Sequence, residues 1–395
     1  MNYILFDTNS IKKHLLPLTY FRPIAEIRCG ILTMKEKWEH HVNAQVSYLT
    51  DDYLQEKFPV HFEEENIYID ASVFPETEMV QMIKSLQKGD ALLDSNGRVI
   101  AYNANPKKYN EEVNLSKKNI RYNKPLDSIT YPYHIFQKNA QQIQADFEIV
   151  TQKKSSCKLS ETNTIIGSGK VFVAEGASVE AAIFNTQDGN IYIGKNATIL
   201  EGSLIRAPFA MLENSLVKMG AKIYGGTTLG PNTKAGGEIK EVVFFGNANK
   251  GHDGYLGDSV IAEWCNLGAD TNNSNLKNNY SNVKLYDYST NDFVNTGLQF
   301  CGLIMGDHSK SGIATMFNTG TVLGVSSNIF GSGYQPKFFP SFKWGNKNHV
   351  NYRYDKALEV AKVVTKRRNI DFDKVEERLF RKVFELSQKI ENIQK

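Results

Sequence analysis

The sequence has few cysteines, and it lacks any long run of apolar residues. Its four cysteines, at positions 29, 157, 265 and 301, lie far apart without paired spacing, so neither a disulfide framework nor a cysteine metal site is expected. No segment approaches the roughly 20 apolar residues of a membrane span. Residues 1–7 carry no basic segment of the kind that begins a signal peptide. We therefore expect a cytoplasmic protein with reduced thiols and no membrane partner.

The chain also has little excess of charge. Its formal net charge is only +3, so no acidic polymer is required as a partner and no nucleic acid is expected. The basic residues Lys362, Lys366, Arg367 and Arg368 lie near interleaved acidic residues, which is typical of a solvated helix face. With 395 residues, of which 41% are hydrophobic, the chain should form two or three domains with a substantial core.

Residues 1–150 alternate between strand-like and helix-like patterns. Residues 3–6, 46–49 and 67–70 have the apolar character of short strands, and residues 78–86 have the spacing of an amphipathic helix. This alternation predicts an α/β domain with a small parallel or mixed sheet.

From residue 155 to residue 335 the pattern changes to an apolar residue at every sixth position. A six-residue period fits neither an α-helix nor an isolated strand, but it suits a coil of three short strands in which each strand contributes one inward side chain. Stacked coils would bury the inward column, and glycines and asparagines would occupy the corners. The unbroken part of the series is Ile193, Ile199, Ile205, Met211, Val217, Ile223 and Leu229. We predict a β-helix, followed over 336–395 by an extended aromatic arm and two helices, at about 355–366 and 373–394.

A cluster of polar motifs follows the regular series and resembles a known family. Glu238-Ile239-Lys240, Gly251-His252, and residues 255–258 (Tyr-Leu-Gly-Asp) are followed by residues 266–269 (Asn-Leu-Gly-Ala) and Asn275. In order and spacing they are similar to the acetyltransferase half of the bifunctional N-acetylglucosamine-1-phosphate uridyltransferase/glucosamine-1-phosphate acetyltransferase family. The resemblance implies that the β-helix is left-handed.

The N-terminal domain resembles the shortened sugar nucleotidyltransferase domains that are fused to such β-helices. Leu16-Pro17 and Arg22-Pro23 lie where the family carries its sugar-nucleotide loop, and residues 67–70 resemble the strand that delivers a metal-binding aspartate.

Amide formation from an amino sugar requires a base, because the ammonium group is not nucleophilic. His252 is suited to that role, since imidazole titrates near physiological pH. Glu238 is a candidate to orient the imidazole, although the family match supports its position better than this role, and the resemblance places Asn266 on the sugar or its amine. The plain alternative is that His252 is a loop histidine bonded to the backbone.

The resemblance assigns Lys240 and Tyr255 to the sugar phosphate. Lys222 stands where the family has an arginine, so it would keep the charge but lose the bidentate fork; alternatively it points to solvent. Asn275 corresponds to the residue at the junction of sugar and acyl thioester. The next residue is Leu276 where the family has tyrosine, and the loop that follows is longer, which leaves the identity of the amino sugar open.

Thr296 and Gln299 correspond to the family's coenzyme A wall, although small residues near Gly297 also suit ordinary corners. The resemblance further implies a homotrimer in which a neighbouring subunit completes the acyl-donor groove.

The N-terminal domain lacks the glycine-rich phosphate loop that nucleotidyl transfer usually needs. Residues 7–14 occupy the place of the family's phosphate loop and contain no glycine, so backbone amides would approach a phosphate less easily. Lys12, Lys13 and Arg22 are candidates to supply positive charge, and Asp70 is a candidate Mg²⁺ ligand. Such a domain either is structural, binds a different nucleotide, or has degenerated.

The sequence thus predicts an acetyl-CoA-dependent N-acetyltransferase whose acceptor is an amino-sugar phosphate, with glucosamine 1-phosphate as the expected acceptor. One alternative is a bifunctional enzyme that also joins the acetylated sugar phosphate to UTP in the presence of Mg²⁺. Another is a non-catalytic β-helix that binds a sugar nucleotide or a protein. The acyl chain, the exact sugar, the nucleotide and any regulation stay open.

Overall fold

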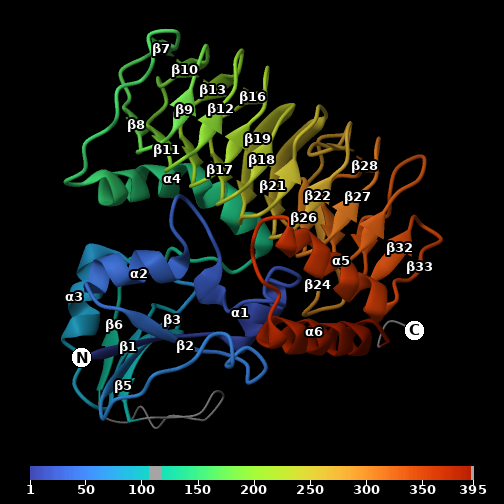
Figure 1. The fold of residues 1–395 in the computed structure, drawn as a ribbon. Helices are drawn as coiled ribbons and strands as arrows, with labels where there is room; N and C mark the ends of the chain where they lie inside the picture. The colour runs from blue at the N-terminus through green and yellow to red at the C-terminus, as the bar shows by residue number, and fades with distance from the viewer. Residues whose placement is uncertain (106–117, 393–395) are drawn as a thin grey trace. The chain divides into compact units, whose positions relative to one another are not determined.

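The computed structural model describes residues 1–105 and 118–392. By its contacts the chain forms two compact units. The first contains residues 1–15, 19–27 and 32–131, and the second contains residues 16–18, 28–31 and 132–395. The predicted fold class, an α/β domain, a parallel β-helix and C-terminal helices, is confirmed (Figure 1). None of the described helices combines the length and the apolar character that a membrane crossing would require.

The first unit is built on a mixed six-stranded sheet. Its strand order is β2-β1-β3-β5-β4-β6, with β1 parallel to β2 and β3, and β5 antiparallel to β3 and β4. Its elements are β1 (Asn2–Phe6), α1 (Asn9–His14), a 3-10 turn (Ile24–Glu26), α2 (Met34–Val42), β2 (Val46–Leu49), β3 (Asn66–Asp70), α3 (Thr77–Lys84), β4 (Asp90–Leu93), β5 (Val99–Ala104) and β6 (Lys118–Arg121). The central strands β1 and β3 are buried over most of their length, as expected when both faces of a sheet are covered.

The β-helix has three columns of short parallel strands. The first column is β7 (Thr164–Ile166), β10 (Ile183–Asn185), β13 (Leu204–Arg206), β16 (Lys222–Ile223) and the first parts of β19 (Glu238–Phe244) and β21 (Tyr255–Ile261). The second is β8 (Val171–Val173), β11 (Ile191–Ile193), β14 (Phe209–Met211), β17 (Thr227–Leu229), the later parts of β19 and β21, β26 (Leu303–Met305), β29 (Thr321–Leu323) and β31 (Phe338–Phe339).

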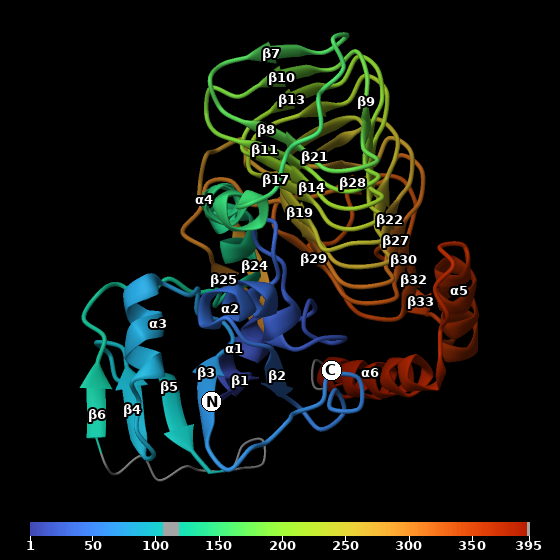
Figure 2. The same cartoon turned by 60° about the vertical axis from the view of Figure 1, so that its left-hand side comes forward.

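The third column closes each coil. It contains β9 (Ser178–Val179), β12 (Thr198–Ile199), β15 (Leu216–Val217), β18 (Lys234–Ala235), β20 (Asn249–Lys250), β22 (Asn266–Leu267), β27 (Lys310–Ser311), β30 (Asn328–Ile329) and β32 (Lys343–Gly345), with β33 (Val350–Asn351) antiparallel to β32. The strands β23 (Asn272–Asn273) and β28 (Met316–Phe317) pair separately, and β24 (Lys284–Asp287) and β25 (Asp292–Asn295) form a hairpin. Figure 2 shows the coils stacked on one another.

The predicted six-residue series forms the inner column. All seven members, from Ile193 to Leu229, are at most 2% exposed and belong to one hydrophobic cluster. The cluster continues through Ile239 and Leu256 to Phe339. The hexapeptide prediction is therefore confirmed, because one buried side chain per strand is what closes the core.

The predicted aromatic arm is in part the end of the β-helix. Strand β31 pairs parallel to β29, and β32 pairs parallel to β30, so the coils continue past the expected boundary at 335. Phe339 is fully buried in the same core as the hexapeptide series. The sequence indicates an extended aromatic arm in this segment because the spacing of six is broken there, although the core still requires large side chains.

Helices complete the second unit. Helix α4 (Pro132–Thr151) packs against β17, β19 and β21, where Asn139 Nδ2 donates to Gly226 O at 2.8 Å and to Thr228 Oγ1 at 3.0 Å. Gly30 N donates to Asn139 Oδ1 at 2.6 Å, so residues 28–31 belong to this packing. Helices α5 (Tyr354–Lys366) and α6 (Lys374–Asn392) follow the last coil, where Phe342 contacts the rings of Phe380 and Phe384.

Candidate active site

Strand alternation places three of the predicted site residues on one outer face. Ile223, Ile239 and Leu256 are neighbours in register and point into the core. Successive side chains of a strand point to opposite faces. Lys222, Glu238 and Tyr255, which precede them and are also in register, therefore point outward together. Lys240 lies two residues further along β19, opposite Gly257, and faces the same way.

His252 lies on a tight loop between β20 and β21. Its side chain is exposed, and among the described residues no hydrogen-bond partner engages its ring. The loop packs over Gly237, whose φ is +77° and where a Cβ atom would meet Gly254 O at 2.7 Å. Only a residue without a side chain fits there at this φ. The structure shows no hydrogen bond between Glu238 and the imidazole.

A buried lysine anchors the same loop. Lys250 is paired in register with Ala235, so it takes an inward position in the column. Its Nζ donates to His252 O at 2.8 Å and to Gly236 O at 3.0 Å. Burial lowers the pKa of Lys250 to about 8, since desolvation disfavours the ammonium form. This ammonium ties the histidine loop to the neighbouring coil.

Asn275 joins one predicted and one unpredicted member of the site. Its Nδ2 donates to Tyr255 Oη at 2.9 Å and to Asp258 Oδ2 at 2.5 Å. Both amide hydrogens are therefore used, and Asn275 Oδ1 remains as an acceptor. Since Tyr255 Oη accepts from Asn275, its own O–H is left to donate outward. Desolvation raises the pKa of Tyr255 to about 12, which keeps that hydroxyl protonated at neutral pH.

Asp258 is the buried acceptor at the inner end of this hydrogen-bond network. It is 2% exposed and stands at a corner of the coil with φ of +48°. Desolvation raises its pKa to about 6, against the lowering effects of the Asn275 hydrogen bond and of the charge of Lys240. Glu241, at the corner of the preceding coil, pairs with Lys240 at 3.5 Å. Lys240 Nζ also lies 4.8 Å from the centre of the Phe300 ring.

Asn266 lies on the third column, apart from the first-column residues. Its Oδ1 accepts from Asn249 Nδ2 at 2.7 Å, its neighbour in register. Among the described residues nothing accepts a hydrogen bond from Asn266 Nδ2, so that group is available as a donor.

Thr296 and Gln299 lie on the insertion at 276–300, after the β24–β25 hairpin. Thr296 is 8% exposed; its hydroxyl donates to Val283 O at 2.8 Å and accepts from Leu298 N at 3.1 Å. These bonds hold the base of the hairpin. Gln299 is exposed.

In the first unit, Lys12 sits in a saturated polar cluster. Its Nζ is 2.8 Å from Asp7 Oδ2, from Asp51 Oδ2 and from Thr50 Oγ1. An ammonium group has three donors, so this one has none to spare for a phosphate. Lys13 is exposed, and Arg22 is buried at 5% exposure.

Asp70 is held by an ion pair. Its Oδ2 accepts from Arg98 Nη2 at 2.7 Å, Arg98 Nε at 3.2 Å and Thr8 Oγ1 at 3.0 Å. Its Oδ1 accepts from the backbone N–H and the hydroxyl of Ser72. Both oxygens are thus fully engaged, and the described residues contain no group of three or more acidic, histidine or cysteine side chains arranged to hold a metal. This donor set does not fit Mg²⁺, which requires free carboxylate oxygens.

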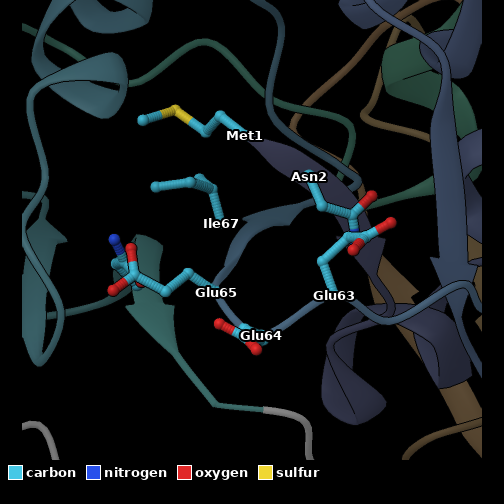
Figure 3. Close-up of a pocket in the computed structure, with 7 residues that line it drawn as sticks. Met1, Asn2, Glu63, Glu64, Glu65 and Ile67 are labelled. Carbon is cyan, nitrogen blue, oxygen red and sulfur yellow. The ribbon is translucent and has the colours of Figure 1, made fainter.

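A cavity of about 630 Å³ also lies in the first unit (Figure 3). It is lined by Asn2 and Ile67, near the amino ends of β1 and β3, and by Glu63, Glu64 and Glu65. Ligands of open α/β sheets bind outside the carboxyl ends of the strands, where Asp70 lies. The cavity is therefore at the opposite end of these strands from the predicted nucleotide site.

Sequence reasoning missed three contributors. Asp258 was recognised only as part of a motif, although an aspartate directly after a Leu-Gly corner is a signal for a left-handed residue. Glu241 follows the Glu-Ile-Lys motif and could have been noted in the same way. Lys250 carried no signal, because an inward lysine is revealed only by the register of its strand with β18.

Fold and site together define a two-part protein in which a parallel β-helix presents a histidine loop beside a tyrosine–asparagine–aspartate network. Comparison with known proteins agrees with this class. Residues 3–155 match the family model of sugar nucleotidyl transferases. The chain is 34% identical over 111 residues to the bifunctional protein GlmU of Methanococcus aeolicus, covering 28% of this chain and 26% of that protein.

Two further similarities extend the comparison. The bifunctional sugar-1-phosphate nucleotidylyltransferase/acetyltransferase of Sulfurisphaera tokodaii is 29% identical over 144 residues, which are 36% of this chain and 35% of that protein. Among solved structures, the polysialic acid-specific acetyltransferase NeuO is 16% identical with a TM-score of 0.28, covering 49% of this chain and 86% of that one. The chain spans about a quarter of the length of the GlmU proteins that it matches. The family resemblance expected from the motifs is confirmed.

Proposed function

We propose that the protein is an acetyl-CoA-dependent N-acetyltransferase whose acceptor is an amino-sugar phosphate, with glucosamine 1-phosphate as the expected acceptor. The observation that supports this most directly is the arrangement of the Asn275 amide, which leaves the Tyr255 hydroxyl free to donate outward, three residues after the exposed His252 in the sequence. The sequence relationship to bifunctional nucleotidylyltransferase/acetyltransferases adds support.

In the proposed reaction, the acceptor's ammonium group first loses one proton to solvent. The resulting amine attacks the thioester carbonyl while His252 removes a second proton from the attacking nitrogen, and the tetrahedral oxyanion then collapses to an amide as the thiolate of coenzyme A leaves. The imidazolium gives its proton to that thiolate, so of the two protons lost by nitrogen one goes to solvent and one to the thiol. The ring of His252 is free to act in this way because Lys250 anchors the loop through the backbone of residue 252, leaving the side chain untouched.

Tyr255 and Asn275 supply the remaining polarity. The outward O–H of Tyr255 donates to an oxygen of the substrate or of the developing oxyanion, and Asn275 Oδ1 accepts from the attacking amine. Their orientation is fixed by Asp258, which is buried behind them and acts as a positioning residue.

Fixed charge for the acceptor would come from Lys240 and Lys222 on the same outer face. In this proposal Glu238 neutralises Lys222 in part or orients His252, and Asn266 Nδ2 donates to the sugar. Thr296 and Gln299 lie on the insertion that would border the acyl donor, with a neighbouring subunit of a homotrimer on its other side. A monomer in sedimentation that retains full activity would contradict the trimer.

A bifunctional enzyme is the second candidate, because residues 3–155 match the sugar nucleotidyl transferase family. The saturated surroundings of Lys12 and Asp70 do not favour it. The two are separated by assaying pyrophosphate release from UTP and N-acetylglucosamine 1-phosphate with Mg²⁺. We expect no release above background, and a Mg²⁺-dependent burst would establish the second activity.

The proposed function is tested by thiol release from acetyl-CoA against a panel of amino sugars, their 1-phosphates and their 6-phosphates. We expect release with an amino-sugar phosphate. Absence of release with every acceptor would refute the proposal and favour a β-helix that only binds a sugar nucleotide or a protein.

A further inference from the structure

An open polar cavity that the proposed reaction does not use lies between the insertion after Asn275 and the neighbouring coils. It has a volume of about 440 Å³ and is lined by Ser274, Lys277, Asn279, Asn318, Thr319 and Tyr334, among others. This volume is within the usual range for a small-molecule site. The cavity begins at the residues on either side of Asn275, so it adjoins the candidate active site within the same unit.

Hydrogen-bond donors dominate the lining of this cavity. Asn279 Oδ1 accepts from the backbone N–H and hydroxyl of Ser281, and Asn318 Oδ1 accepts from Thr319 N at 3.1 Å. The acceptor ends of both amides are therefore turned back to their own loops. Among the described residues nothing accepts from Asn279 Nδ2 or Asn318 Nδ2, so both remain free to donate.

Positive charge is present without a counter-charge. Lys277 Nζ donates to Asn282 O at 2.5 Å and to Ser281 Oγ at 3.3 Å, which leaves the third donor of its ammonium group unused. Lys337 is close by: burial first, and then the charge of Lys277, lower the pKa of Lys337. No carboxylate in the described part of the chain forms an ion pair with either lysine. Two adjacent cations without an acidic partner are stabilised by a bound anion.

An aromatic ring borders the same space. Tyr334 is 65% exposed, although the backbone there is held by a bridge to Met316 and by Gln335 N donating to Met316 O at 2.9 Å. A large exposed ring on a fixed backbone offers a flat apolar surface beside the donors, as a sugar ring would require.

We infer that this cavity binds the phosphoryl group of the sugar phosphate, with Lys277, Asn279 and Asn318 on the phosphoryl oxygens and Tyr334 against the sugar ring. The inference rests on the proposed function for the role of the bound sugar as acceptor. It replaces Lys222 and Lys240 as the groups that contact the phosphate, so that the charge of these two lysines on the face of the coil serves only to attract the acceptor.

The test is isothermal titration of the full chain with glucosamine 1-phosphate, glucosamine, glucuronate and inorganic phosphate. Lys277→Gln and Asn318→Ala should each weaken glucosamine 1-phosphate binding about tenfold or more, because each removes a hydrogen bond to a charged group. Lys284→Gln, an exposed lysine on β24 of the same insertion, is the matched control and should leave the affinity unchanged. Circular dichroism of each variant verifies that it is folded.

The other probes identify the source of the anion. Tyr334→Ala should weaken glucosamine 1-phosphate but not inorganic phosphate. Glucosamine, which lacks the phosphoryl group, should bind weakly and equally to wild type and Lys277→Gln. Glucuronate binding as tight as that of the sugar phosphate would overturn the assignment to a phosphoryl group, and equal affinity for inorganic phosphate would overturn the assignment to a sugar.

The outcomes also separate this inference from the proposed function. If no acceptor releases thiol but Lys277-dependent binding persists, the acetyltransferase proposal fails and the cavity assignment stands. If acetyl transfer occurs and neither Lys277→Gln nor Asn318→Ala changes binding or the KM for the acceptor, the cavity assignment is overturned and the function stands.

Discussion

The two units differ in how completely their key polar side chains are hydrogen-bonded. In the first unit, Asp70 accepts five hydrogen bonds and Lys12 contacts three oxygens. The acceptors of Asp70 and the donors of Lys12 are therefore already used and are not available to a ligand. In the β-helix, Asn275 and Tyr255 are held from behind and keep one group each directed outward. A saturated polar cluster stabilises a fold, whereas a half-saturated one that is held rigidly is suited to bind and react.

The largest expected effect comes from removing the imidazole. His252→Ala should lower kcat/KM for acetyl transfer about 10²- to 10⁴-fold, the usual range for a general base. Steady-state thiol release measures this. His40→Ala, an exposed histidine of the first unit, is the control and should keep the full rate. An undiminished rate in His252→Ala would remove this residue from the mechanism.

The second effect concerns the outward hydroxyl. Tyr255→Phe keeps the ring but removes both the outward donor and one acceptor of the Asn275 amide. We expect kcat to fall about 10²-fold, in line with the loss of one oxyanion donor. Tyr224→Phe, directly after β16 and two coils before Tyr255, serves as the control, since Tyr224 is 40% exposed and is not the tyrosine bonded to Asn275. A change confined to KM would assign Tyr255 to ground-state binding alone.

In the first unit the same kind of substitution should act on folding and not on rate. Asp70→Asn leaves Arg98 beside a neutral amide, and we expect a loss of about 2 to 4 kcal/mol in the free energy of unfolding. Urea denaturation measures it. The acetyl-transfer rate of the folded variant should equal that of wild type, with and without a metal chelator. Unchanged stability together with weaker Mg²⁺ binding would show that Asp70 is a metal ligand after all.

The smallest effect is a gain in stability. The pKa of Asp258 rises from 3.8 to about 6 on folding, so ionising it costs more in the folded chain than in the unfolded one. Above pH 6 this cost is fully present, and below about pH 4 it is absent because both states are protonated. Asp258→Asn should therefore gain on the order of 1 to 3 kcal/mol at pH 8. Denaturation at several pH values should show the gain shrinking as pH falls; a constant gain would contradict the raised pKa.

Much of the fold followed from one periodic signal. The spacing of Ile193 to Leu229 predicted the inner column because a coil can only close if each strand buries one side chain. The six-residue spacing is broken before Phe339, so the spacing does not predict strand β31. That strand nevertheless pairs with β29 and continues the coil. The packing of helix α4 on β17 and β19 has no such signal, because it depends on Asn139 and Thr228, which are far apart in sequence.

The site was predicted in part for the same reason. His252, Tyr255 and Asn275 belong to a motif, and the register of adjacent coils brings Tyr255 and Asn275 into contact. The saturation of Asp70 and Lys12 by hydrogen bonds could not be predicted, because it depends on which partners the fold brings within hydrogen-bond distance. Arg98 lies 28 residues from Asp70 and only the antiparallel return of β5 places it nearby.

The insertion at 276–300 leaves and rejoins the coil at nearly one point. Cys301 N donates to Asn275 O at 2.9 Å, and Leu276 and Phe300 form a bridge across the base of the insertion. The strands above and below are in register without it. Such a segment can be exchanged for a loop of different length without disturbing the coils on either side. The exchange would change which acceptor binds, while the stacking of the β-helix stays the same.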